Sequence, residues 1–166
     1  ILENYGTIKE ARKKRFNLFY LLSYIEKMRG EQNIKIEVNR RNFDSKYEVA
    51  NYYGISMLVM TKEDMFAHKI VAMYERIEKT SRDVFDVWYF LQNEWPINKQ
   101  IVESRVKMPY KEFLSESIKA LEKLNNKNIL AGMGELLTEK QKAWAKENLK
   151  KDVLFLLKLK LESENS

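Results

Sequence analysis

The stretch from Thr61 to Phe90 constrains this chain most, because it places ionisable residues among apolar ones at the spacing of two consecutive helices. The first helix is predicted to run from Thr61 to about Ile77, with Thr61 and Asp64 forming a variant capping box. The second is predicted from Ser81 to Asn93, and Pro96 stops it. Two charged helices in succession therefore occupy the middle of the chain.

In the segments before these helices, the spacing of apolar residues differs from one segment to the next. A helix is predicted from Ile8 to Met28, because apolar residues recur there at three-and-four spacing. Asn33 to Asn39 alternates strictly between apolar and polar residues, which predicts a half-exposed strand. Tyr47 to Tyr53 and Ile55 to Met60 are rich in aromatic and β-branched residues, which predicts two strands or one strand with a bulge.

The rest of the chain is predicted to be helical. Helices are expected from Asn98 to Val106, from Pro109 to Leu124 and from Thr138 to Leu161, the last opened by Thr138 and Gln141 as a capping pair. The order of helix, small mixed sheet and further helices predicts an α+β fold with a C-terminal helical lobe. The predicted division lies between residues 1–60 and residues 61–166.

Composition narrows the partners and the compartment. Thirty Lys and Arg residues against twenty-four Asp and Glu give a net charge of +6, which mildly favours polyanionic partners. The chain has no cysteine, which excludes a disulfide framework and predicts a cytoplasmic protein. One histidine disfavours a zinc site, and the apolar runs are too short to span a bilayer, so no membrane partner is expected.

The two central helices contain the candidate site. Lys69 and Arg76 lie seven residues apart on one helical stripe, so the two cations could straddle a triphosphate. On the second helix Arg82 and Asp86 are four residues apart, and Asp83 and Asp86 are three apart. This acidic edge beside a cation could orient a ribose, a base or a nucleophilic hydroxyl.

A structural interpretation of the same residues stays open. Arg82 and Asp86 could form an ordinary surface ion pair, worth a few tenths of a kcal/mol. Against this, the second helix is apolar over much of its circumference, and charges on a buried helix usually have specific partners. His68 is expected to be structural, because its neighbours Phe66, Ala67 and Ile70 are apolar.

A basic run lies outside these helices. It comprises Arg12, Lys13, Lys14 and Arg15, to which Arg40 and Arg41 can be added. Such residues could contact RNA phosphates, because each neutralised phosphate releases counterions. The alternative is a solvated, charged face without a partner.

The segments EDMFAHKIVAMYER and SRDVFDVWYFL resemble the C-terminal half of the AbiEii/AbiGii-type nucleotidyltransferases, the toxins of type IV toxin–antitoxin systems that act in abortive infection and phage defence. That family pairs a helix containing a lysine and an arginine with a helix that opens Arg-Asp-x-x-Asp. The matching positions here are Lys69, Arg76, Arg82, Asp83 and Asp86. The similarity covers about Phe16 to Asn93.

The resemblance implies an enzyme that transfers nucleotides from an NTP, with Mg²⁺, to an acceptor such as tRNA. It implies that Lys69 binds phosphates and that Asp83 and Asp86 act with it in catalysis. It also implies that Arg76 and Arg82 supply further positive charge for binding the nucleotide. Glu37 fits the family's third metal-binding carboxylate. A solvated strand carboxylate between Lys35 and Asn39 is the other interpretation of Glu37.

The family's glycine loop followed by Asp-x-Asp is absent from this sequence, which begins at Ile1 rather than Met. We therefore expect the rear part of such an enzyme, inactive alone, although a degenerate relative stays open. Residues 1–60 would be a partial nucleotidyltransferase-like region, and its sheet would be a remnant of the catalytic core. The expected partners of the protein are an NTP, an RNA and an antitoxin. The rival class is a non-catalytic helical interaction or nucleic-acid-binding domain, in which Lys69 to Asp86 is a buried polar network.

Overall fold

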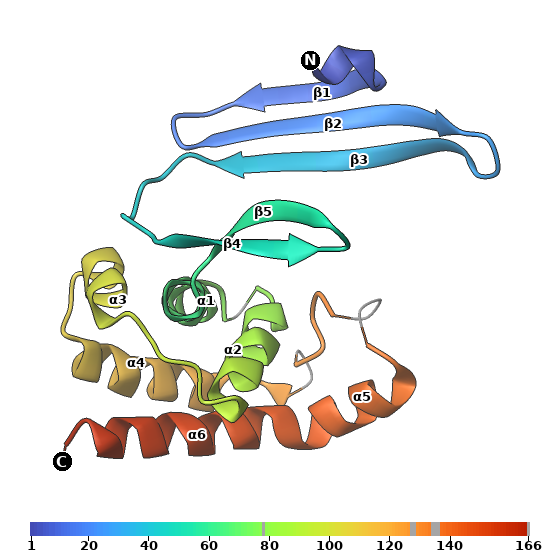
Figure 1. The fold of residues 1–166 in the computed structure, drawn as a ribbon. Helices are drawn as coiled ribbons and strands as arrows, with labels where there is room; N and C mark the ends of the chain where they lie inside the picture. The colour runs from blue at the N-terminus through green and yellow to red at the C-terminus, as the bar shows by residue number, and fades with distance from the viewer. Residues whose placement is uncertain (78, 127–128, 134–136, 166) are drawn as a thin grey trace. The chain divides into compact units, whose positions relative to one another are not determined.

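The computed structural model describes residues 1–77, 79–126, 129–133 and 137–165, and it confirms the predicted α+β class. In these residues, strands β1 (Thr7–Lys13), β2 (Asn17–Glu26) and β3 (Gly30–Asn39) form a three-stranded antiparallel sheet in that order. Strands β4 (Tyr47–Tyr52) and β5 (Ile55–Met60) form a separate antiparallel pair (Figure 1). The helices are α1 (Lys62–Arg76), α2 (Arg82–Gln92), α3 (Lys99–Val106), α4 (Tyr110–Lys123), α5 (Glu139–Trp144) and α6 (Lys150–Ser163).

The chain divides into two compact units, Ile1–Asn42 and Phe43–Ser166. The first unit contains a short 3₁₀ turn at Leu2–Asn4 and the three-stranded sheet, and the second contains β4, β5 and the helices. The predicted boundary after residue 60 lies within the second unit. The prediction assigned residues 1–60 to the nucleotidyltransferase-like region of an enzyme family. The division into compact units does not test that assignment.

The predicted helix from Ile8 to Met28 is wrong, because this stretch forms β1 and β2. Its apolar residues satisfy helical spacing, but Leu18 to Leu22 of β2 form a continuous apolar run, which a strand can also accommodate. Alternate residues of this run form apolar cross-strand pairs on one face of the sheet: Leu18–Val38, Tyr20–Ile36 and Leu22–Ile34. β1 is exposed along most of its length, so its sequence lacks the pattern that marks a buried strand.

The predicted strand from Asn33 to Asn39 is confirmed as part of the longer β3. The other two predicted strands are confirmed as the hairpin β4–β5, in which Tyr52 pairs with Ile55 across a two-residue loop. Both loop residues have positive φ, +48° at Tyr53 and +80° at Gly54. Positive φ at both central positions is typical of a type I′ turn, and glycine at the second of them removes the strain of that conformation.

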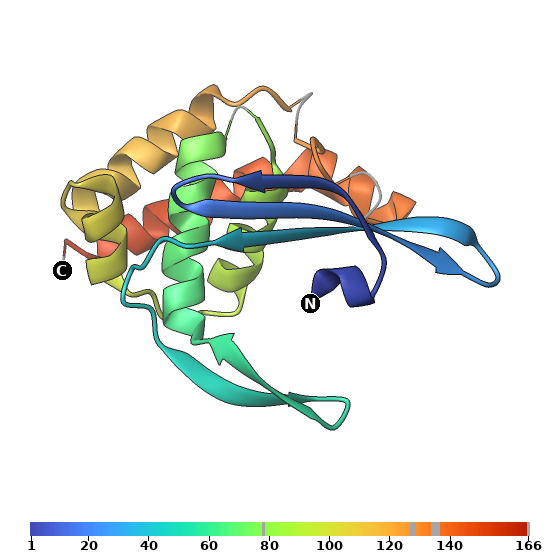
Figure 2. The same cartoon turned by 90° about the horizontal axis from the view of Figure 1, so that it is seen from above.

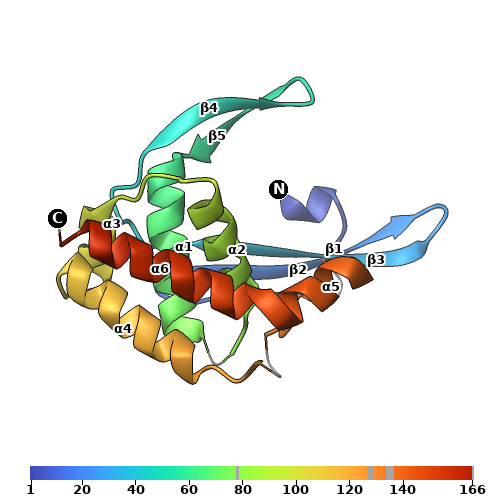
Figure 3. The ribbon, with the colours of Figure 1, turned by 90° about the horizontal axis from the view of Figure 1, so that it is seen from below.

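Helix α1 lies at the centre of the helical unit and packs against α2, α3 and α4, while β5 leads directly into it (Figure 2). Helix α6 lies across α2 and α4 (Figure 3). Helices α1, α2, α3, α4 and α6 each turn an apolar face inward, and fully buried side chains from five segments share one core: Phe66, Met73, Val84, Phe113, Leu121, Ile129 and Leu157. No helix among the described residues is long and apolar enough to cross a membrane.

The predicted helices after Thr61 are confirmed to within one or two residues at each end. The last of them, Thr138 to Leu161, consists of α5, a π-helical segment at Ala145–Leu149, and α6. Its predicted capping box is present, because the Thr138 hydroxyl accepts from the backbone N–H of Gln141 and the Gln141 side chain accepts from that of Thr138.

The predicted capping box at Thr61 is wrong. The Thr61 side chain makes no capping hydrogen bond. The carboxylate of Asp64 is fully buried and instead accepts hydrogen bonds from the Lys46 backbone N–H at 2.6 Å and from the Asn98 side chain at 2.7 Å. Asn98 is itself the N-cap of α3 and accepts from the Ile101 N–H. Asp64 therefore joins the segment before β4, α1 and the start of α3.

Replacement of Asp64 by alanine is expected to lower the free energy of unfolding by about 2 to 4 kcal/mol, because both hydrogen bonds to its buried carboxylate are lost. Urea denaturation followed by circular dichroism measures this loss. Glu112→Ala is the matched control, since Glu112 also lies in the first turn of a helix but is exposed. Equal losses in the two variants would contradict the assigned role of Asp64.

Candidate functional site

The centre of the candidate site is an ion-pair network between α1 and α2. The Lys69 ammonium on α1 donates to the Asp86 carboxylate at 2.5 Å and lies 3.6 Å from the nearer oxygen of Asp83. The guanidinium of Arg76, also on α1, lies 2.8 Å from the other oxygen of Asp83. The structure thus brings together four of the six predicted site residues.

The network follows from how the two helices bury their apolar faces. Val84, Val87 and Phe90 occupy the buried face of α2, and Asp83 lies on the same stripe, one turn before Val87. Its side chain is only 4% exposed. A carboxylate in this position needs compensating charge, which the two cations seven residues apart on α1 supply.

Exposure separates the members of the network. The side chains of Lys69 and Asp86 are 34% and 28% exposed, and Arg76 is 51% exposed, so all three remain in contact with solvent. Asp83 is covered, and the Arg76 guanidinium contacts it as an ion pair without the alignment of a hydrogen bond. The site therefore has a buried anchor and an accessible edge of two cations and one carboxylate.

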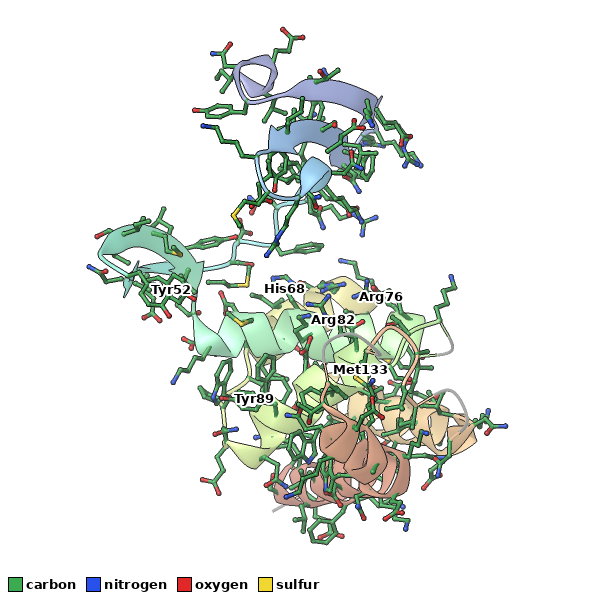
Figure 4. All side chains as sticks on the ribbon, turned by 90° about the vertical axis from the view of Figure 1, so that its right-hand side faces the viewer. Tyr52, His68, Arg76, Arg82, Tyr89 and Met133 are labelled. Carbon is green, nitrogen blue, oxygen red and sulfur yellow. The ribbon has the colours of Figure 1, made fainter. Side chains whose placement is uncertain are left out.

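Arg82 is exposed at the start of α2, near Arg76 of α1, whereas Tyr89 lies farther along α2 (Figure 4). Within the described ranges the Arg82 side chain forms no ion pair, so the ordinary pair between Arg82 and Asp86 is absent. Asp86 turns to Lys69 of the neighbouring helix instead. A tertiary contact has replaced the local one that spacing alone suggested.

Glu37 lies in the first unit, on β3. Its carboxylate accepts a hydrogen bond from the Asn17 side chain at 2.7 Å and pairs with Lys35 at 2.9 Å. These two contacts, that of Lys35 first, hold the pKa of Glu37 below its ordinary value. Glu37 is exposed and charged, and the structure describes it in a different unit from Lys69, Asp83 and Asp86.

A metal would need several convergent ligands. In the part of the chain that the structure describes, no three His, Cys, Asp or Glu side chains gather into such a set. Asp83 and Asp86 face Lys69 and Arg76 rather than a third carboxylate. These residues do not make up a Mg²⁺ site by themselves, and the metal role of Glu37 stays a prediction.

A second polar cluster surrounds His68, which sequence reasoning treated only as a structural residue. Its Nε2 lies 2.7 Å from the Ser45 hydroxyl, and the Arg105 guanidinium donates to its Nδ1 at 3.0 Å and to its carbonyl at 3.1 Å. Arg105 also pairs with Glu75 at 3.1 Å. Because arginine only donates, Nδ1 must accept, and the neutral ring has its proton on Nε2.

The surroundings of His68 disfavour its charged form. Burial lowers the pKa of His68, the positive charge of Arg105 lowers it further, and the carboxylate of Asp64 acts in the opposite direction. Protonation of Nδ1 would also set two donors against each other. His68 is therefore a neutral link between the segment before β4, helix α1 and helix α3.

The chain is similar to a known protein family and to a solved structure. The family model described as "Nucleotidyl transferase AbiEii toxin, Type IV TA system" matches residues 3–152. Among solved structures, JHP933 from Helicobacter pylori is similar, with a TM-score of 0.57 and 19% sequence identity over 96% of this chain. The present chain spans 65% of that protein's length. At this identity the likeness shows the fold alone, and no curated protein matches.

Removing the charge of Asp83 is expected to destabilise the second unit more than removing that of Asp86. Asp83→Asn should lower the free energy of unfolding by about 2 to 3 kcal/mol, because two cations lose a buried partner. Asp86→Asn should lower it by less than about 1 kcal/mol, since that pair is partly solvated. Urea denaturation of both variants measures the difference, and a larger loss in Asp86→Asn would refute the assignment of Asp83 as the anchor.

Stability is expected to fall on acidification through the titration of His68, the chain's one histidine. Its pKa in the folded state lies below the ordinary value of 6.5, so the unfolded chain binds the proton first as the pH drops. The free energy of unfolding should therefore decrease below about pH 6.5, by at most about 1.4 kcal/mol per pH unit.

The matched variant is His68→Asn, which keeps an acceptor near the Nδ1 position but cannot titrate. Between neutral pH and the onset of carboxylate protonation, its free energy of unfolding should change less with pH than that of the parent chain. Urea denaturation at a series of pH values measures both slopes. Equal slopes would show that another group is responsible.

Proposed function

We propose, from the premise that the chain belongs to the nucleotidyl transferase AbiEii toxin family of type IV toxin–antitoxin systems, that its second unit binds the phosphates of an NTP during nucleotidyl transfer. The observation that supports this most is the Lys69 ammonium, held between two carboxylates yet 34% exposed. The ammonium is therefore fixed in position by the protein and can still be reached by a ligand from solvent.

The geometry suits Lys69 to phosphate binding. An ammonium has three donors, and one of them points to Asp86. The carboxylates restrict the lysine side chain to one position before any ligand arrives, which lowers the entropy cost of binding. Arg76 lies beside the same carboxylates and is half exposed, so it can meet a second phosphate oxygen.

The two aspartates are proposed to differ in their contribution. Asp83 is too deeply buried to touch a substrate, so it is a positioning residue that holds Lys69 and Arg76. Asp86 is partly exposed, so it could accept the proton of the attacking hydroxyl. In that step the hydroxyl oxygen bonds to the α-phosphorus, pyrophosphate leaves, and the proton passes to Asp86.

The other predicted residues are assigned by the same reasoning. Arg82 is exposed and forms no ion pair among the described residues, so we assign it to the charge of the nucleotide or the acceptor. Mg²⁺, when bound, would neutralise phosphate charge. Glu37 is the one ligand for this metal that the family resemblance suggests within this chain.

The wider setting is proposed on the family alone. A tRNA or another RNA is the proposed acceptor, an antitoxin the functional partner, the cytoplasm the compartment and phage defence the process. Because the chain spans 65% of the length of its structural relative, these proposals concern the whole protein. Nucleotide binding is the part that this chain can test by itself.

The test is binding of the four NTPs, in fluorescent form, to the chain and to two variants. Lys69→Met is expected to weaken binding by about 10- to 100-fold, because it removes a charge-assisted hydrogen bond to phosphate. Lys62→Met is the matched control, since Lys62 is an exposed lysine at the N-terminal end of α1. Fluorescence anisotropy measures the dissociation constants, and thermal unfolding verifies that each variant is folded.

The outcomes separate the enzyme from a scaffold. Equal weakening in Lys62→Met would mean that only net charge matters. Failure of the parent chain to bind any NTP, together with severe unfolding of Lys69→Met, would favour a structural network and sink the proposal.

A further inference from the structure

The positive charge of the chain is concentrated in the first unit. Residues 1–42 contain ten Lys and Arg residues and five Glu, a net charge of +5, whereas the whole chain has +6. The larger second unit is therefore nearly neutral. A three-stranded sheet with this charge excess has the electrostatic character of a surface that binds polyanions.

Most of these cations gather at one end of the sheet, around the turn that joins β1 to β2. They are Arg12, Lys13, Lys14, Arg15, Lys35, Arg40 and Arg41. Arg40 belongs to this end because its backbone N–H donates to the carbonyl of Phe16 in the turn. Within the described residues, two of the seven pair with a glutamate, Arg12 with Glu10 and Lys35 with Glu37. The end of the sheet keeps an excess of positive charge.

One face of this end combines cations with an aromatic ring. The strand register places Arg12 opposite Phe19, and Phe19 opposite Glu37, in one row across the sheet. The Arg12 guanidinium lies 4.3 Å from the centre of the Phe19 ring and the Lys35 ammonium lies 5.7 Å from it. A hollow of about 280 Å³ opens here, lined by Arg12, Lys14, Asn17, Phe19, Lys35 and Glu37.

A second aromatic ring lies in the turn itself. The Arg15 guanidinium lies 5.0 Å from the centre of the Phe16 ring and that of Arg41 lies 5.5 Å from it. Phe16 is 42% exposed, so the ring and its two arginines are open to solvent. The two rings with their cations form the basic–aromatic surface of the first unit, defined by Arg12, Arg15, Phe16, Phe19, Lys35 and Arg41.

We propose that this basic–aromatic surface binds a single strand of nucleic acid, with bases stacked on the rings and guanidinium planes and with phosphates on the cations. Single strands are recognised by this combination, because every base has a face that stacks and every linkage has a charge. The hollow beside Phe19 also offers the Asn17 amide and the Glu37 carboxylate as polar partners for a base edge.

Two other polyanions fit the surface less well. A duplex hides its base faces, so it could use the cations but not the rings. An anionic membrane would need apolar side chains to insert beside the charges, and the row at the hollow contains one ring among polar residues. Identification of the strand as the acceptor rests on the proposed function, but binding of the strand does not.

The test is binding of the 166-residue chain to a labelled single-stranded RNA of about 12 nucleotides, followed by fluorescence anisotropy. The logarithm of the affinity should fall linearly with the logarithm of salt concentration between about 50 and 200 mM. Phe19→Leu should weaken binding about fivefold or more with little change in that slope, because it removes stacking but no charge. The double variant R15A/R41A should weaken binding about tenfold and make the slope shallower by about 1.

The matched control is K27A/R29A, which removes two exposed cations from the turn at the opposite end of β2. Equal weakening by this control would show that net charge alone attracts the RNA and would overturn the proposal. Tighter binding to a duplex, or to vesicles of phosphatidylcholine and phosphatidylserine, would also overturn it. A DNA strand of the same sequence separates RNA from general single-strand binding, and either result agrees with the proposal.

The test is independent of the nucleotidyl-transfer site. Lys69→Met should bind the labelled strand as the parent chain does, because Lys69 belongs to the other unit. Loss of NTP binding with intact RNA binding would leave this proposal standing. Loss of RNA binding in Phe19→Leu and R15A/R41A with intact NTP binding would assign the two ligands to separate units.

Discussion

The ion pairing of Asp83 is the interaction on which the arrangement of α1 and α2 depends. A carboxylate on the apolar face of a helix is costly to bury, and here cations from the neighbouring helix offset that cost. The two helices must therefore pack in one rotational setting, with Lys69 and Arg76 facing α2. Apolar packing alone would tolerate other settings, because Val84 and Val87 could be accommodated by many grooves.

The same pairing explains how charged side chains stay accessible at the edge of a core. Asp83 satisfies the buried side of the network, which leaves the outer side to Lys69, Arg76 and Asp86. The four side chains carry no net charge together, but the exposed edge has two cations and one carboxylate. An anion that approaches this edge meets the two cations, and a triphosphate is an anion of suitable charge and length.

Local pattern predicted the helical part of the fold because apolar residues recur there at helical spacing and because α3 and α5 begin at capping residues. It failed from Ile8 to Met28, where apolar spacing fits a helix and a strand equally and the deciding hydrogen bonds come from β3. β3 follows β2 across a three-residue turn, residues 27–29, which contains no Gly, Asn, Asp or Pro to mark it. The hairpin β4–β5 was predictable for the opposite reason, since its turn contains Gly54 at a position of positive φ.

The candidate site shows the same limit at the level of single residues. Lys69 and Asp86 could be predicted to meet because each lies on one of two adjacent helices, and the contact joins neighbours in the chain. Asp64 and His68 each also have a partner farther along the chain, 34 residues away at the cap of α3 and 37 residues away on α3, and nothing in the local sequence indicates these contacts. Prediction from pattern therefore reaches polar contacts between successive elements. Contacts that close longer loops depend on how the whole helical unit packs, and they appear only once α3 is placed against α1.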